Sequence, residues 1–139
     1  MNILLIDDDK VFSEPLVWQL RQEGYEVTDC QSIEDVLDER GELKVSPPDC
    51  IILDIMMPRG DKYSRNETDA GKSTGLRLLQ DLETAAVNTP VIIITIRDDL
   101  GEDEVRKWSR SVKKCLLKIE VTPTEVIKAI NEVSSEGKG

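Results

Sequence analysis

Short apolar runs recur along the chain, and they restrict its fold more than any other feature of the sequence. Three of these runs, ILLI, IIL and VIII, are apolar at every position rather than at every second position. A strand of this kind is covered on both faces, as in a parallel sheet. We therefore expect strands at Asn2–Ile6, Glu26–Cys30, Cys50–Leu53, Val91–Thr95 and Cys115–Leu117.

Helical patterns fill the segments between these strands. Apolar residues recur three or four positions apart, and cap signals such as Ser32 and the Thr122–Glu125 capping box mark helix starts. The expected helices cover Val11–Gln22, Ser32–Arg40, Leu76–Glu83, Glu102–Arg110 and a last segment after Thr122. Alternating strands and helices predict an α/β fold, with a doubly wound parallel sheet and helices on both faces. Such sheets bind ligands at the carboxyl ends of their strands.

Charge and composition exclude several classes of protein. With 28 acidic and 18 basic residues among 139, the net charge is −10, which disfavours binding to nucleic acid or to anionic lipid. The apolar runs are too short to span a membrane, and the N-terminus lacks the pattern of a signal peptide. We therefore expect a single cytoplasmic domain.

Cysteine and histidine usage narrows the chemistry. The three cysteines are odd in number and widely spaced, which predicts reduced thiols and no disulfide framework. Histidine is absent, which excludes Ser–His and Cys–His nucleophile pairs and the commonest zinc ligand. Any reaction of this chain must therefore use carboxylates, hydroxyls or lysines.

Reactive side chains follow four of the expected strands. The first strand ends in Asp7–Asp9, the third in Asp54, the fourth in Thr95 and the fifth in Lys118. Carboxylates that meet at one edge of a sheet repel one another, and a cation such as Mg²⁺ relieves that repulsion. A carboxylate can also act as a nucleophile and form an aspartyl-phosphate, with a metal and a lysine neutralising the phosphoryl charge.

At these residues the sequence resembles the receiver domain of response regulators, and the resemblance covers essentially the whole chain. It rests on the motifs ILLIDDD (Ile3–Asp9), LDIMMP (Leu53–Pro58), VIIIT (Val91–Thr95) and LLK (Leu116–Lys118). Each motif is weak alone, but four in order at strand ends are specific. The resemblance implies a flavodoxin-like five-stranded sheet in the order 2-1-3-4-5, formed by a stand-alone domain similar to the chemotaxis regulator.

The resemblance also implies a role for each of these positions. Asp54 would accept a phosphoryl group, Thr95 would turn toward it and Lys118 would pair with it. Asp8 would bind Mg²⁺ directly and Asp7 mainly through water. The implied metal ligands are Asp7, Asp8, Asp54 and the backbone carbonyl of Met56. The phosphoryl donor would be a histidine kinase or a phosphotransfer protein, and an unidentified protein would receive the signal by contact. Apart from self-catalysed phosphoryl transfer and slow dephosphorylation, no enzyme activity is expected.

The sequence departs from the family pattern at several places. Ile96 stands where the family commonly has a small residue, Cys115 where it often has a switching aromatic, and Ile119 where it usually has a proline on a cis bond. We expect Ile96 to slow dephosphorylation. We also expect the Lys118–Ile119 bond to be either trans, with a rearranged turn, or strained.

The domain boundaries form a further expectation. Residues 1–133 are expected to be the receiver domain and 134–139 a flexible tail. A long polar loop, 59–74, follows the third strand, where the family has only a few residues. Its basic residues suggest a loop that folds over phosphorylated Asp54.

The sequence leaves two alternatives open. A receiver fold that is never phosphorylated would act purely as an interaction module, and the changes at Ile96, Cys115 and Ile119 favour it. A phosphatase of the haloacid dehalogenase type would share the pattern of an apolar strand followed by DxDxV, with Asp7 as its nucleophile. Against the phosphatase, no further acidic pair follows Lys118 to hold magnesium, and no cap-sized insertion is present.

Overall fold

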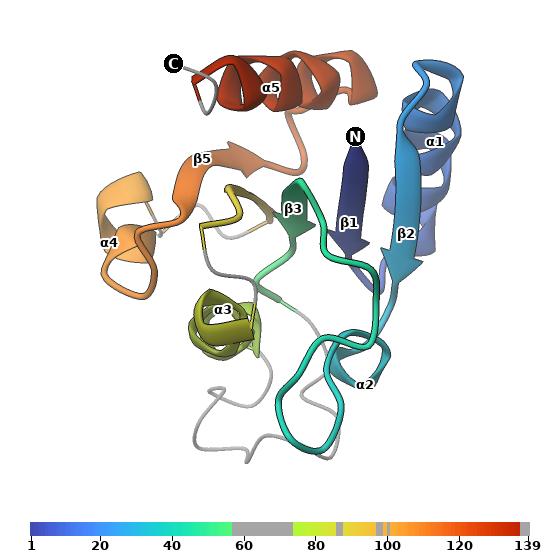
Figure 1. Cartoon of the computed structure of the whole chain (residues 1–139). Helices are drawn as coiled ribbons and strands as arrows, with labels where there is room; N and C mark the ends of the chain where they lie inside the picture. The colour runs from blue at the N-terminus through green and yellow to red at the C-terminus, as the bar shows by residue number, and fades with distance from the viewer. Residues whose placement is uncertain (57–73, 86–87, 97–98, 100, 137–139) are drawn as a thin grey trace.

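The computed structural model describes residues 1–56, 74–85, 88–96, 99 and 101–136. One five-stranded parallel sheet runs through it in the order β2-β1-β3-β4-β5 (Figure 1), which confirms the predicted fold class and strand order. The strands are β1 (Asn2–Ile6), β2 (Glu26–Cys30), β3 (Cys50–Leu53), β4 (Val91–Thr95) and β5 (Val112–Leu117). The helices are α1 (Lys10–Gln22), α2 (Ile33–Val36), α3 (Thr74–Ala85), α4 (Glu102–Arg106) and α5 (Pro123–Glu136).

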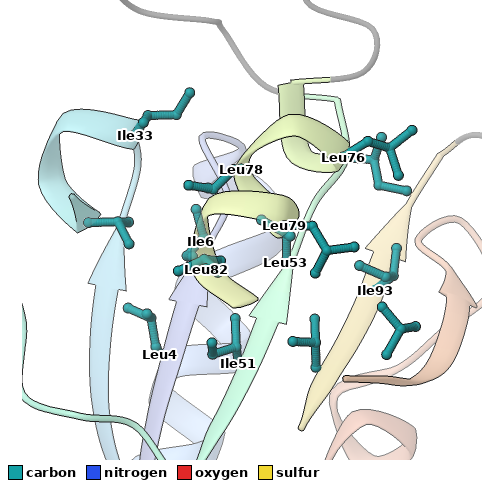
Figure 2. Packing of buried hydrophobic residues seen from close by; sticks show 14 of the residues in the cluster. Leu4, Ile6, Ile33, Ile51, Leu53, Leu76, Leu78, Leu79, Leu82 and Ile93 are labelled. Atoms are coloured by element: carbon teal, nitrogen blue, oxygen red, sulfur yellow. The ribbon is translucent and has the colours of Figure 1, made fainter. Parts of the chain in front are cut away.

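The helices divide between the two faces of the sheet. Helices α1 and α5 lie together on one side, and α2, α3 and α4 lie on the other (Figure 1). Each layer packs against alternate residues of the same strands. Leu4 and Ile6 of β1 join the cluster under α3, which Figure 2 shows, whereas Ile3 and Leu5 join the cluster under α1 and α5. Burial on both faces explains why these strands are apolar at every position.

Helix α2 is shorter than the sequence suggests, and the expected end at Arg40 is wrong. It ends at Val36, and Leu37 is already extended, with φ −120° and ψ 142°. The carboxylate of Asp38 accepts hydrogen bonds from the backbone N–H of Arg40 at 2.8 Å and of Glu42 at 3.0 Å. Aspartate offers the backbone this local alternative to the helix, so the chain turns instead.

The region between α4 and β5 also differs from expectation. Helix α4 ends at Arg106 rather than Arg110, and β5 begins at Val112 rather than Cys115. The guanidinium of Arg106 donates to the carbonyl of Val112 at 3.2 Å, which ties the helix end to the strand start. Two consecutive lysines interrupt the apolar pattern in the first half of β5, so the pattern alone does not predict a strand there. A strand at the border of a sheet tolerates such charges.

Helix α5 starts with the predicted capping box. The backbone N–H of Glu125 donates to the hydroxyl of Thr122 at 3.3 Å, and α5 extends to Glu136, into the segment 134–139 that we expect from the sequence to be a flexible tail. The expected loop 59–74 lies outside the described residues except for Thr74, which begins α3. Among the described helices, none has the length and apolarity needed to cross a membrane.

Candidate functional site

The carboxyl ends of β1, β3, β4 and β5 bring the predicted site residues together. Asp7, Asp54 and Lys118 each come directly after a strand, and each backbone N–H still bonds to the neighbouring strand. Asp7 donates to the carbonyl of Cys30 at 3.0 Å, Asp54 to that of Ile6 at 3.0 Å, and Lys118 to that of Thr95 at 2.8 Å. The sheet backbone therefore fixes where these three side chains start.

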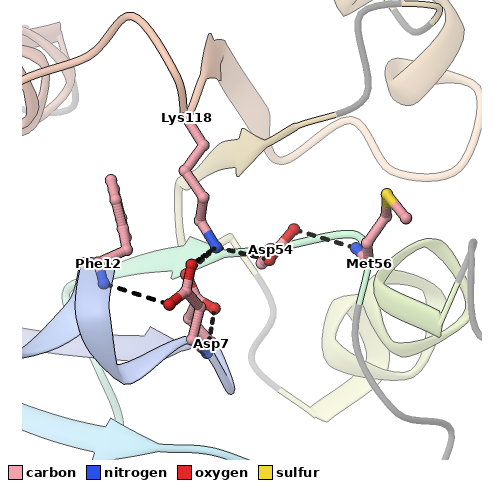
Figure 3. A network of polar contacts seen from close by, with 6 residues as sticks. Asp7, Phe12, Asp54, Met56 and Lys118 are labelled. Carbon is pink, nitrogen blue, oxygen red and sulfur yellow. Dashed lines mark hydrogen bonds and ion pairs between the residues drawn. The ribbon is translucent and has the colours of Figure 1, made fainter.

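Lys118 lies at the centre of a cluster of carboxylates (Figure 3). Its Nζ atom is 2.8 Å from Asp7 Oδ2, 2.9 Å from Asp54 Oδ2 and 3.5 Å from Asp9 Oδ2. The Lys118 side chain is only 8% exposed, and those of Asp7 and Asp54 are 2% and 5% exposed. We call Asp7, Asp8, Asp54, Thr95 and Lys118 the acid pocket.

Backbone groups orient the two buried carboxylates. The N–H of Asp9 donates to Asp7 Oδ1 at 2.9 Å, and the N–H of Met56 donates to Asp54 Oδ1 at 3.0 Å. In each case the donor comes two residues after the acceptor, so a local turn holds the side chain. The hydroxyl of Thr95, which is fully buried, adds a hydrogen bond to Asp54.

Burial changes the protonation chemistry of the pocket. It raises the pKa of Asp7 from 3.8 to about 6, although hydrogen bonds from Lys118 and the Asp9 backbone oppose the change. Burial likewise raises the pKa of Asp54, against the effect of Lys118. For Lys118, burial lowers the pKa, but the hydrogen bonds to Asp7 and Asp54 outweigh it, and the net shift is upward. The carboxylates outnumber the ammonium, so the pocket favours a further cation.

The donor set fits a magnesium ion. Asp7, Asp8 and Asp54 each offer a carboxylate oxygen, and these oxygens lie within 4.8 Å of one another. Asp8 is exposed whereas the other two are buried, so the site opens to solvent on one side. Hard oxygen ligands with room for water suit Mg²⁺.

A glycine that the sequence analysis did not single out allows α3 to pack beneath the pocket. The N–H of Gly75 donates to the carbonyl of Ile55 at 2.7 Å. A Cβ atom on Gly75 would lie 2.4 Å from Ile55 Cα and 2.5 Å from the carbonyl oxygen of Asp54. Only glycine fits this approach without displacing the backbone that carries Asp54. In the sequence, the feature that could have indicated this role is a glycine at the start of a helical pattern.

Of the residues that depart from the family pattern, Ile96 and Ile119 directly follow Thr95 and Lys118 in the chain, and Cys115 lies in β5. Ile96 and Ile119 are 52% and 79% exposed, and Cys115 is half-buried against the cluster under α3. Burial raises the pKa of the Cys115 thiol. Among the described residues no peptide bond is cis, so the Lys118–Ile119 bond is trans. We call Ile96, Cys115 and Ile119 the apolar rim.

The fold and the site define a flavodoxin-like α/β domain with an acid pocket at the carboxyl ends of its strands. The chain belongs to the response regulator receiver domain family, whose model matches residues 3–131. Neither this match nor the structural neighbours favours a phosphatase of the haloacid dehalogenase type.

Relatives by sequence are longer proteins. The chain is 30% identical over 102 residues to the response regulator MprA of Mycolicibacterium vanbaalenii, a match that covers 73% of this chain and 37% of the relative. The response regulator MprA of Mycobacterium avium is also 30% identical, with 73% and 38% covered. The chain thus spans little more than a third of these relatives.

Solved structures share the fold. A CheY-like response regulator receiver domain protein from Methanospirillum hungatei is 20% identical with a TM-score of 0.69, and the match covers 99% of this chain and 95% of that one. A two-component response regulator from Clostridium difficile is 18% identical with a TM-score of 0.72, over 100% and 99%. TrrA from Thermotoga maritima, solved with Mg²⁺ and BeF, is 21% identical with a TM-score of 0.68, over 95% and 97%.

Proposed function

We propose that this chain is a phosphorylation switch of two-component signalling, with Asp54 as its phosphoacceptor. The observation that carries the proposal is the buried Asp54 carboxylate, held 2.9 Å from Lys118 Nζ and within reach of two further acids. A carboxylate oxygen of Asp54 would attack the phosphorus of a phosphohistidine. A P–O bond forms, the P–N bond breaks, and the imidazole leaves.

The neighbours of Asp54 have separate tasks in this reaction. Lys118 would keep its charge beside Asp54 and pair with the transferred phosphoryl group, and the Thr95 hydroxyl would donate to one of its oxygens. The Met56 N–H holds Asp54 in one orientation before attack. Mg²⁺ would bind to Asp7, Asp8, Asp54 and the Met56 carbonyl, where it would neutralise phosphoryl charge. A nearby cation also favours ionised Asp54, whose pKa burial raises.

The partners follow from this chemistry. A histidine kinase or a phosphotransfer protein would supply the phosphohistidine, and a downstream protein would recognise the phosphorylated form. The charge of about −1.5 to −2 that a phosphate adds would alter the surface around the pocket. We place this exchange in the cytoplasm, where the kinase substrate ATP is available.

Thermal melting with Mg²⁺ and beryllofluoride, a phosphoryl mimic, tests the proposal. A ligand that binds only the folded state, at a hundred times its Kd, adds about 2.7 kcal/mol of stability. We expect a clear rise in Tm for the wild type that disappears in Asp54→Asn. The matched control is Asp103→Asn, which removes an exposed carboxylate of α4 and should keep the rise.

Magnesium without beryllofluoride separates metal binding from phosphoryl binding. If beryllofluoride adds nothing beyond magnesium in the wild type, Asp54 is not a competent acceptor. The interaction module that works without phosphorylation would then be the better description.

A further inference from the structure

We propose that Phe12 is a positioning residue whose ring holds the Lys118 ammonium in the acid pocket. Lys118 Nζ lies 4.9 Å from the centroid of the Phe12 ring. An ammonium at this distance over a ring face is attracted by the negative π-surface, and more strongly where water is excluded. The 8% exposure of the Lys118 side chain provides that exclusion. The inference rests on the proposed function of the pocket.

The position of Phe12 is set by the start of α1. Asp9 caps this helix, and its Oδ1 atom accepts a hydrogen bond from the Phe12 backbone N–H at 3.3 Å (Figure 3). Its Oδ2 atom lies 3.5 Å from Lys118 Nζ. Phe12 is half-buried and packs against the cluster under α1 and α5. The same helix start thus approaches Lys118 with a carboxylate and with an aromatic face.

The ring contact differs in kind from the ion pairs. Lys118 has its two shortest ion pairs with Asp7 and Asp54. Mg²⁺ would compete for both carboxylates, and phosphorylation would convert Asp54 into an acyl phosphate. The ring of Phe12 is a partner that neither event removes. It would keep the ammonium directed at Asp54 while its anionic partners change, without a hydrogen bond that must break.

A purely structural role for Phe12 predicts something different. If the ring only fills space against the cluster under α1 and α5, its shape matters and its electron density does not. Fluorination separates the two, because it withdraws charge from the ring face and changes the ring volume little. Phe12 is the single phenylalanine of the chain, so biosynthetic replacement with fluorinated phenylalanines alters this position alone.

The experiment compares the full chain carrying phenylalanine, 4-fluoro-, 3,5-difluoro- and 3,4,5-trifluorophenylalanine. We measure the rate of Asp54 phosphorylation by phosphoramidate in Mg²⁺. The rate should fall stepwise with fluorination, by about threefold to tenfold across the series. Phe12→Leu should slow the phosphorylation by a similar factor. Phe12→Tyr, which keeps an aromatic ring, should react at the rate of the wild type. Equal rates across the fluorinated series would overturn the proposal.

A second readout does not depend on phosphorylation. The fluorine resonance of 4-fluoro-Phe12 should shift when Lys118→Met removes the ammonium, and should stay in place for Lys113→Met, which changes an exposed lysine of β5. If the resonance does not shift in Lys118→Met, the contact between Phe12 and Lys118 is refuted, even if Asp54 is phosphorylated. A Lys118-dependent resonance in a protein that takes no phosphoryl group would instead refute the proposed function and preserve the contact.

Discussion

Residues of the acid pocket and of the apolar rim follow one another in the chain, but their side chains differ strongly in exposure to solvent. Thr95 is fully buried, whereas Ile96, the next residue, is 52% exposed. The Lys118 side chain is 8% exposed, whereas Ile119 is 79% exposed. One step along the backbone separates a side chain held by the sheet from one that points into solvent. The pocket therefore keeps the family pattern while the rim departs from it.

This difference has a physical cause. The first residues after β1, β3 and β5 still bond through their backbone to the adjacent strand: Asp7 to Cys30, Asp54 to Ile6 and Lys118 to Thr95. Its side chain then starts from a fixed point and meets the others at the sheet end. In the rim, Ile96 and Ile119 come one residue after Thr95 and Lys118, and Cys115 lies in the border strand β5. Substitution there changes the surroundings of the reaction without moving the reactive groups.

The largest effect should come from removing the ammonium of Lys118 at the centre of the acid pocket. Lys118→Met leaves Asp7, Asp9 and Asp54 without their ammonium. We expect Asp54 phosphorylation by phosphoramidate to slow by at least about a hundredfold, the usual cost of losing one electrostatic group at a phosphoryl centre. Phosphate-affinity gels measure the rate. Lys113→Met is the matched control, and a loss below tenfold for Lys118→Met would contradict the assignment.

The next largest effect should come from the close packing of α3 beneath the acid pocket. Gly75→Ala places a methyl group 2.4 Å from Ile55 Cα, so the backbone beneath Asp54 must shift. We expect the free energy of unfolding to fall by about 2–3 kcal/mol, as for an overpacked core. Urea denaturation measures it. Gly101→Ala has open space around it and weakens only the N-cap of α4, so it should cost less, about 0.5–1 kcal/mol. Equal losses in the two variants would show that the close approach is unimportant.

The titration of Asp7 tests how burial in the acid pocket affects stability. Burial raises its pKa from 3.8 to about 6, so the folded protein holds this proton more tightly than the unfolded chain. Without Mg²⁺, stability is therefore lost as pH rises from about 4 through about 6. Asp7→Asn removes this loss, and at pH 7 it should be more stable than the wild type by about 1–2 kcal/mol.

Melting curves across this pH range test the Asp7 prediction. Magnesium should stabilise the wild type at pH 7 and stabilise Asp7→Asn less, because the variant offers a neutral ligand. Asp103→Asn should follow the wild type at every pH. A wild-type stability that rises between pH 4 and pH 7 relative to Asp7→Asn would reverse the sign and refute the argument.

The sequence predicts the residues of the acid pocket better than the contacts that hold them in place. Four strands have the predicted bounds, and three of them, β1, β3 and β4, are doubly buried strands that leave an unbroken apolar signal. Asp7, Asp54 and Lys118 could be placed together because parallel strands end at a common edge. Strand β5 is longer than the sequence predicts, because lysines on this border strand interrupt the apolar pattern.

The contacts that support the pocket could not be predicted in the same way. In the sequence, Phe12 is one apolar position of a helix. Its contact with Lys118 requires the start of α1 and the end of β5 to meet across more than a hundred residues. The role of Gly75 requires knowing how closely α3 approaches β3, and the early end of α2 depends on a side chain that competes with the helix. These are properties of packing and local hydrogen bonding, which a periodic pattern does not carry.

The smallest predicted effect concerns the rim. Ile96 extends a branched side chain beside Thr95, where water must approach an acyl phosphate on Asp54. Ile96→Ala should shorten the half-life of phosphorylated protein by about threefold to tenfold, which is a barrier change near 1 kcal/mol. The decay after removal of phosphoramidate measures it. Ile119→Ala deletes the same atoms from a more exposed position and should change the half-life less. A wild-type half-life no longer than that of Ile96→Ala would mean that the rim does not limit access of water to the pocket.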